Sequence, residues 1–475
     1  MGAHSMRSQT VKKSRTLQGA MQSWAAASLL IMGFVSGGLA GCASHSDHTK
    51  AARSALDAGN AQKALELYNK RLEVDDAKDL PKNVGGDNTV LLLDRAMILQ
   101  QVQNYKLSSR DLEVADKQIE VLDFSRKAID DIGKYLFSDS TGPYKAPFYE
   151  KLLINTQNML NYLQQQDLNG ARIEARRLAV MQSFISDHEG EGASLIGPGS
   201  YFAGFIFEKS GDPQEALRYY DEALQFSDFK NLGPVVRRLA AKGSYRTKRI
   251  QAIIDSASAG TPRAPEGSGG GPEEAPTELL VVVNHGRVPA KVPKRIPIGL
   301  ALTYASMFIS PASAAQANQL AAQGLVTWIN YPALEKEGKV AIPRMLVDGK
   351  DQPIELGLSV DSEAVKAWDE ARGTLVASAI TRMIARVLAG EVARKASGGG
   401  TLGALLSLGT QAALVANDVP DTRSWATLPA RIGIGRVVLP PGKHDVEVVL
   451  GPDHRKQSIE IAPGGYAVVC VTDLR

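Results

Sequence analysis

A stretch without apolar periodicity, residues 255–276, divides this chain into two parts with different patterns. It is rich in Gly, Pro, Ser and Glu and includes the run Gly267-Ser268-Gly269-Gly270-Gly271-Pro272. Such a composition is typical of a flexible linker. Residues 51–254 are rich in helix-forming residues, whereas residues 277–475 contain β-branched runs. The pattern predicts an α+β multidomain protein, in which an α-helical domain precedes a mixed, β-rich domain with inserted helices.

The first 41 residues have the pattern of a secretion signal peptide and not of a folded segment. They contain no acidic residue, and an uncharged apolar run over 24–35 follows four basic residues. This run is shorter than the roughly 20 residues that cross a bilayer, which favours cleavage over an uncleaved signal anchor. The basic residues are Arg7, Lys12, Lys13 and Arg15.

The segment ends in Leu39, Ala40, Gly41 and Cys42, a tetrapeptide that resembles the lipobox of bacterial lipoproteins. The resemblance implies that Cys42 receives acyl chains such as palmitate and becomes the mature N-terminus, with residues 42–50 as a lipid-anchored tether. Because no Asp follows the cysteine, it also implies sorting to the periplasmic face of the outer membrane. Two or more acyl chains hold a protein stably on a membrane. The alternative is an ordinary secretion signal in which Cys42 is incidental.

Charge and cysteine content limit the classes of partner. The formal net charge of +3 falls to −1 once the four basic residues of the signal are removed. A near-neutral chain without a basic run is not expected to bind nucleic acid. If Cys42 is acylated, the second cysteine, Cys470, has no partner for a disulfide, and its apolar surroundings predict a buried, inert thiol.

Helical hairpins are predicted over 51–254. The best unit is spaced as a tetratricopeptide (TPR) repeat: small residues let two helices approach, a glycine permits the turn, and aromatic rings pack against the next hairpin. A second, divergent copy and a third candidate, through Asp167, Ala171, Ala175 and Leu178, indicate a stacked solenoid. An ordinary helical bundle remains the alternative. The predicted packing residues are Gly204, Phe207, Gly211, Ala216, Tyr220 and Ala223 in the first unit and Gly59, Ala64 and Tyr68 in the second.

The second half of the sequence predicts both strands and helices. Residues 278–283 predict a buried strand, and residues 296–334 carry no charge, for which core strands joined by polar turns are expected. Insertion of 296–334 into lipid or a partner is the alternative. Helix is expected over 362–416, with an uncharged buried helix at 402–416, and an antiparallel β-meander closes the chain over 436–471.

No common enzyme signature is present, so no catalytic residue, metal site or cofactor is predicted. The glycine-rich stretch 187–200 is expected to be a connecting loop, because it lacks the Lys-Ser/Thr ending of a nucleotide-binding loop. His45 and His48 are expected in the tether. The remaining candidates, His285, His444 and His454, lie at or near predicted turns and are expected to be solvated.

Residues 421–429, Asp-Thr-Arg-Ser-Trp-Ala-Thr-Leu-Pro, and residues 286–291, Gly-Arg-Val-Pro-Ala-Lys, complete the pattern. With them, the chain resembles, end to end, a poorly characterised family of bacterial outer-membrane lipoproteins with TPR-like helical repeats and a C-terminal β-rich domain. The resemblance implies an envelope protein without catalytic residues. Asp421 and Arg423 are expected to form an ion pair, and Trp425 to pack in the core.

These observations favour a non-enzymatic, lipid-anchored periplasmic adaptor that holds periplasmic or outer-membrane proteins in a groove of stacked hairpins, in cell-wall or export assembly. One alternative is a hydrolase acting on peptidoglycan or polysaccharide, with cell-wall glycan as its ligand. Another is a membrane-inserting or oligomerising envelope component.

Overall fold

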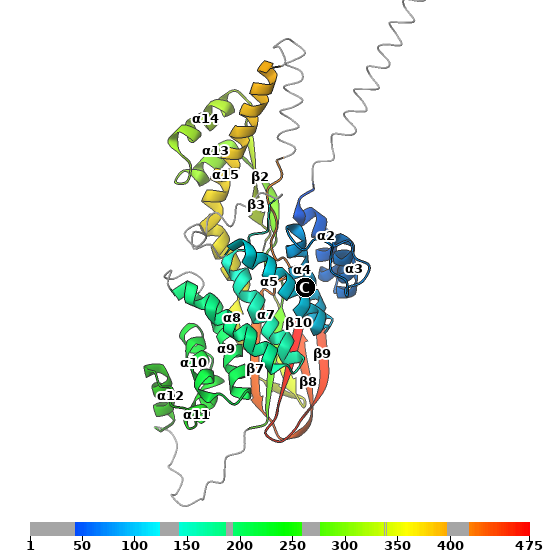
Figure 1. Ribbon diagram of the computed structural model, residues 1–475, viewed down its shortest axis with the longest axis vertical. Helices are drawn as coiled ribbons and strands as arrows, with labels where there is room; N and C mark the ends of the chain where they lie inside the picture. Colours follow the sequence, from blue (N-terminus) through cyan, green and yellow to red (C-terminus); the bar gives the residue numbers. More distant parts are fainter. Residues whose placement is uncertain are drawn as a thin grey trace, which may run out of the picture.

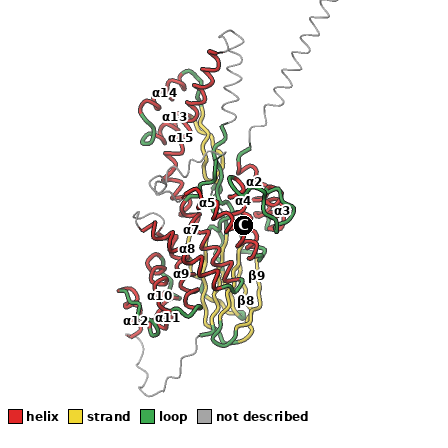
Figure 2. Tube along the Cα trace, viewed as in Figure 1, coloured by secondary structure: helices red, strands yellow, loops and turns green. Residues whose placement is uncertain are grey.

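The computed structural model describes residues 43–123, 142–186, 193–258, 276–336, 338, 340–396 and 418–475. A layer of helices covers one face of a β-sheet, and a second sheet covers the other face (Figure 1). Helices and a two-stranded sheet form an arm that extends from one end of this body (Figure 2). The chain is therefore an α+β protein with paired helices in its N-terminal part, as predicted.

Neighbouring helices of the N-terminal part pack in pairs, and a turn of three residues joins the two helices of four such pairs in the described ranges. No helix in the described ranges is both long and apolar enough to span a bilayer. The helices are α2 (His45–Asp57), α3 (Ala61–Arg71), α4 (Asp87–Gln101), α5 (Tyr105–Asp123), α7 (Phe148–Gln164), α8 (Leu168–Ser186), α9 (Ala193–Lys209), α10 (Pro213–Phe226), α11 (Leu232–Ala240) and α12 (Lys248–Ser258).

The predicted tether over residues 42–50 is wrong, because helix α2 begins at His45. Ser44 caps this helix: its hydroxyl accepts from the backbone N–H of Asp47, and the Asp47 carboxylate accepts from the backbone N–H of Ser44. This capping box satisfies two N–H groups that a helix start leaves unpaired. His45 and His48 therefore lie in α2. The lipobox residues Leu39, Ala40, Gly41 and Cys42 lie outside the described residues.

Two further boundaries differ from the predictions. Helix α9 begins at Ala193, so the end of the expected loop 187–200 is helical, with Pro198 inside the helix. Gly199 lets α9 pack closely against α8, since a Cβ at this position would lie 2.6 Å from Leu178 Cδ2. Helix α12 continues to Ser258, so the first four residues of the predicted linker are helical, and residues 259–275 lie outside the described ranges.

The second half forms three sheets. One has the strand order β10-β1-β7-β6, one β5-β4-β8-β9, and the third pairs β2 with β3. The strands are β1 (Glu278–His285), β2 (Lys291–Pro297), β3 (Trp328–Leu334), β4 (Arg344–Val347), β5 (Lys350–Gln352), β6 (Glu355–Ser359), β7 (Arg431–Val438), β8 (Gly442–Leu450), β9 (Asp453–Ile461) and β10 (Tyr466–Asp473).

The predicted terminal meander is wrong in its pairing, although its strands exist. Only β8 and β9 form a hairpin, while β10 crosses to the other sheet and lies parallel to β1. Strand β7 pairs antiparallel with the opposite edge of β1. Turn residues between the strands indicate reversals of the chain but do not determine which strands become neighbours.

Strand β1 explains why the body has three layers. Every residue of β1 is buried, as predicted for residues 278–283. Leu280 and Val282 pack against the helices, whereas Leu279, Val281 and Val283 pack against the second sheet. Because successive side chains of a strand point to opposite faces, one apolar run supplies both cores. The helices and the first sheet thus share a core across the predicted linker.

The arm has its own core. It consists of β2, β3, α13 (Ile298–Ala305), α14 (Pro311–Ala322) and the long helix α15 (Val360–Ala396). The prediction of core strands over 296–334 is wrong for α13 and α14, where small residues such as Ala301, Ala305 and Ala317 pack the helices closely. Helix α15 is present as predicted, whereas the predicted helix at 402–416 lies outside the described residues.

We expect Gly204→Ala to destabilise the α9–α10 hairpin. A Cβ at this position would lie 2.5 Å from the Tyr220 ring, which cannot retreat because its hydroxyl bonds to Glu208 and Arg436. Such overpacking costs about 1–3 kcal/mol of unfolding free energy, measured by urea denaturation. Gly299→Ala is the control, because nothing lies within 4 Å of its Cβ position. An equal effect of the two changes would contradict the explanation.

Candidate docking surface

The structure brings the predicted packing residues of the first unit together in the α9–α10 hairpin. Gly204 lies against the Tyr220 ring, and the Phe207 and Tyr219 rings stack with their centroids 5.3 Å apart. Gly211 adopts a φ of 78° at the turn, a conformation that favours glycine. Ala216 and Ala223 are fully buried. Except for Gly211, which is exposed at the turn, these residues form the interior of the hairpin and offer no surface to a partner.

The residues of the second unit lie in the α2–α3 hairpin. Gly59 has a φ of 74° at the turn, while Ala64 and Tyr68 are buried. The Tyr68 hydroxyl donates to Asp94 of α4, at 3.0 Å. The third predicted unit corresponds to α7 and α8, and here the Tyr162 ring occupies the place where a Cβ on Gly170 would lie.

The chain's own sheet covers the face of the hairpins on which a partner-binding groove was expected. Asn284 of β1 donates to Gln100 of α4 at 2.9 Å and to Gln157 of α7 at 2.8 Å. Thr472 of β10 also donates to Gln100, at 2.8 Å. All of these side chains are buried. This face of the hairpins is therefore occupied by the chain's own sheet.

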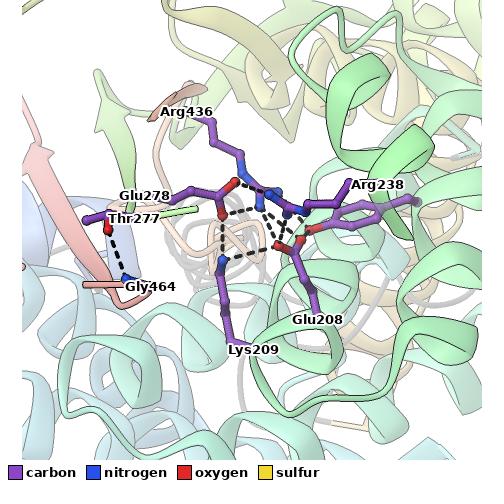
Figure 3. A network of polar contacts seen from close by, with 8 residues as sticks. Glu208, Lys209, Arg238, Thr277, Glu278, Arg436 and Gly464 are labelled. Atoms are coloured by element: carbon purple, nitrogen blue, oxygen red, sulfur yellow. Dashed lines mark hydrogen bonds and ion pairs between the residues drawn. The ribbon is translucent and has the colours of Figure 1, made fainter. Parts of the chain in front are cut away.

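A buried network of charges joins the helices to this sheet (Figure 3). Arg436 of β7 donates to both oxygens of Glu208 of α9, at 2.8 and 2.9 Å, and to Glu278 of β1, at 2.6 Å. Lys209 and Arg238 each contact both carboxylates. The Arg436 side chain is 3% exposed, and Glu208 and Glu278 are 5% and 2% exposed.

The pKa values of this network indicate a fully ionised cluster. Burial alone would raise the pKa of Glu278, but the positive charges of Arg436 and Lys209 lower it to about 2. The pKa of Glu208 is lowered as well, against its own burial, chiefly by Arg436. Both carboxylates are committed to cations that hold two layers of the fold together. The cluster therefore supports structure and offers no free acid or base for catalysis.

A second junction involves residues 418–430, which we call the strap. Arg423 and Asp421 form the expected ion pair, at 2.8 Å, and Trp425 is fully buried, as predicted. Two backbone N–H groups of the strap donate to helices. That of Thr427 donates to Asp94 of α4 at 2.9 Å, and that of Trp425 donates to Glu150 of α7 at 3.1 Å. The motif over 421–429 thus attaches the segment that precedes β7 to the helical layer.

Glu150 has the most perturbed carboxyl environment of this junction. It is buried, accepts from the Tyr144 hydroxyl and from the strap, and interacts with the buried Lys291. Burial raises its pKa to about 7, although Lys291 and the hydrogen bonds act in the opposite direction. Burial in turn lowers the pKa of Lys291. The Glu150 side chain is fully buried, so its carboxyl is not exposed at the surface.

The three candidate histidines take different roles. The prediction that they are solvated is wrong for His285, which is buried with Nδ1 3.2 Å from the Val283 carbonyl oxygen, and for His444, which bonds to Asp348 and the Pro440 carbonyl. His454 is exposed beside Glu447. Within the described ranges, no three His, Cys, Asp or Glu side chains are grouped so that they could hold a metal ion.

A hollow of about 180 Å³ lies beside His285, at the ends of β1 and β10. Its two carboxylates, Asp453 and Asp473, both bind the Arg475 guanidinium. Elsewhere, burial raises the pKa of the Cys470 thiol to about 12, so this thiol is inert, as the sequence suggests. These groups are engaged in structural contacts.

The open side of the helical layer offers a surface that the sequence analysis missed. Ile173 and Val180 of α8 are 53% and 55% exposed, although α8 buries Ala171, Ala175 and Leu178 on its other face. Residues seven apart lie on one side of a helix, so these two side chains form an outward apolar strip. Arg176 is exposed beside them. The sequence contains a hint of this surface, because Ile173 and Val180 are apolar but do not share the helical spacing of the buried residues of α8.

No family model matches this chain, and no curated protein matches it.

We expect Glu150→Gln to flatten the dependence of stability on pH between about 4.5 and 7. The folded-state pKa of about 7 lies above the ordinary value of 4.5, so folding takes up a proton in this range. The stabilisation from Glu150 is fully present below pH 4.5 and is lost as the pH rises to about 7. Urea denaturation across this range measures the slope, and an unchanged slope in the variant would contradict the assignment. Glu66→Gln, at an exposed position of α3, is the control.

Proposed function

We propose that this chain is a non-enzymatic adaptor of the bacterial cell envelope, held at the periplasmic face of the outer membrane by acyl chains on Cys42. Its partners are periplasmic or outer-membrane proteins, and it works in the assembly of the cell wall or of an export system. The lipobox pattern supports the address. The engagement of the buried charged groups in structural contacts supports binding over catalysis.

The outward strip of α8 is the observation that carries this proposal. Its two half-exposed apolar side chains, Ile173 and Val180, lie on a helix whose other face is packed into the core. A rigid helix that presents apolar side chains loses little conformational freedom when it binds. Arg176 adds positive charge to the same face. The strip therefore fits a protein partner with apolar side chains bordered by acidic residues.

Photo-crosslinking in living cells tests the adaptor proposal. A photoreactive residue at position 173 of the full chain is expected to give discrete adducts with envelope proteins that carry acidic, apolar segments. The matched control is position 66 on α3, where the Glu66 side chain is 56% exposed. Identical adducts at both positions, or none at position 173, would contradict the proposal.

The identified protein then allows a quantitative test with purified components. Val180→Glu places a charge on the strip and is expected to weaken binding by about tenfold, which corresponds to about 1.4 kcal/mol. Arg176→Glu is expected to weaken it further by repelling an acidic partner. Unchanged affinity in both variants would mean that the partner binds elsewhere, and the role of α8 would be refuted.

A further inference from the structure

The exposed strip on α8 is bordered by arginines that are paired differently on its two sides. Arg177 lies on the side that faces α5, and its guanidinium is 3.2 Å from the Glu174 carboxylate and 3.8 Å from the Asp116 carboxylate. Arg172 lies on the side that faces α9, where its guanidinium is 5.7 Å from the centroid of the Phe207 ring. The positive charge is therefore neutralised on the α5 side, whereas on the α9 side it faces an aromatic ring.

Arg172 and Arg176 form a pair of cations on the α9 side of the strip. They are one helical turn apart, so they lie on the same side of α8 with their Cβ atoms about 6 Å apart. Among the residues that the structure describes, neither guanidinium forms an ion pair with a carboxylate, and the buried Nε of Arg172 has no hydrogen-bond partner. Like charges at this spacing destabilise a helix. An anion placed beside the two guanidinium groups would relieve that repulsion.

Aromatic packing holds the Arg172 guanidinium in place. The Phe207 and Tyr219 rings beside it are buried and stacked, with an angle of 15° between their planes. Arg218 of α10 lies over the Tyr219 ring, 3.9 Å from its centroid, but it is paired with Glu215 at 2.8 Å. A planar guanidinium that is stacked on a ring loses little freedom when it binds a carboxylate. Arg172 is therefore positioned to bind an anion, whereas Arg218 already has one.

The combination of an apolar strip and two cations fits an amphipathic helix of a partner protein. Ile173 and Val180 are two turns apart and half-exposed, so they can meet apolar side chains that repeat at the same interval on a facing helix. Guanidinium groups bind carboxylates through two parallel hydrogen bonds. The spacing of Arg172 and Arg176 matches two carboxylates that are also one turn apart. An extended strand could not add here, because the α8 backbone is hydrogen-bonded within the helix.

We infer, on the basis of the adaptor function proposed above, that α8 binds an amphipathic helix whose carboxylates, four residues apart, contact Arg172 and Arg176. The apolar face of that helix covers Ile173 and Val180. Because Arg177 on the α5 side is already neutralised, the acidic side of the partner helix faces α9. The charges thus determine which way the partner helix is turned about its own axis.

Photo-crosslinking from position 173 of the full chain in living cells tests this inference when the two charges are removed. Arg172→Met is combined with Arg176→Gln, because a methionine keeps an apolar contact with Phe207 and lacks the charge. We expect the yield of the protein adduct to fall about tenfold. Arg218→Gln is the matched control, since Arg218 stacks on the same pair of rings but already has a carboxylate partner. Its adduct yield is expected to be unchanged.

Two further measurements separate charge from folding and identify the partner segment. Arg176→Gln alone, at an exposed position, is expected to lower the yield about threefold while the urea denaturation midpoint stays unchanged. Sequencing of the crosslinked peptide is expected to show two Asp or Glu residues four apart beside apolar residues. Exchanging these acidic residues for Lys is expected to restore the adduct in a chain that carries Arg172→Glu and Arg176→Glu.

The outcomes distinguish the acidic partner helix from the adaptor function. Full adduct yield after removal of both charges would overturn the acidic partner helix and leave the adaptor function standing. A crosslinked peptide without paired acidic residues would also overturn it, as would capture of a lipid, a glycan or another part of this chain at position 173. Absence of any adduct from a chain with both arginines intact would refute the adaptor function itself.

Discussion

The rest of the structure depends on the buried contact between Arg436 and the carboxylates of Glu208 and Glu278. It joins strand β7 to helix α9 and to strand β1, which lie far apart in the sequence. Removing charges from water is costly, so a buried cluster is tolerated only where every charge meets its partners. Lys209, Arg238 and the Tyr220 hydroxyl complete the cluster. In the observed placement of the helical layer on the sheet, both carboxylates meet cations.

That placement determines which surfaces remain for binding. The sheet fills the side of the hairpins where a partner groove was expected, through Asn284 and Thr472 against Gln100. The strap closes a second junction by Thr427 and Trp425. The outward strip of α8 is among the surfaces that stay exposed. The adaptor proposal uses this strip and requires no reactive group.

Local patterns of the sequence predicted local structure well. The spacing of Gly204, Gly211 and Tyr220 anticipates the α9–α10 hairpin, because close packing and turns demand those residue types. The apolar run over 278–283 anticipates a buried strand. Contacts between segments far apart in the sequence were not predicted. The parallel pairing of β10 with β1, and the seating of Arg436 between two carboxylates, depend on contacts between segments whose spacing in the sequence carries no signal.

A double-mutant cycle between Glu208→Gln and Arg436→Met tests the central claim most directly, with urea unfolding as the measurement. If the buried cluster couples the helical layer to the sheet, the two changes will be non-additive, with an interaction energy of about 1–3 kcal/mol and a single unfolding transition. Additive effects, or separate unfolding of the helices and the sheets in the unmodified protein, would contradict the account.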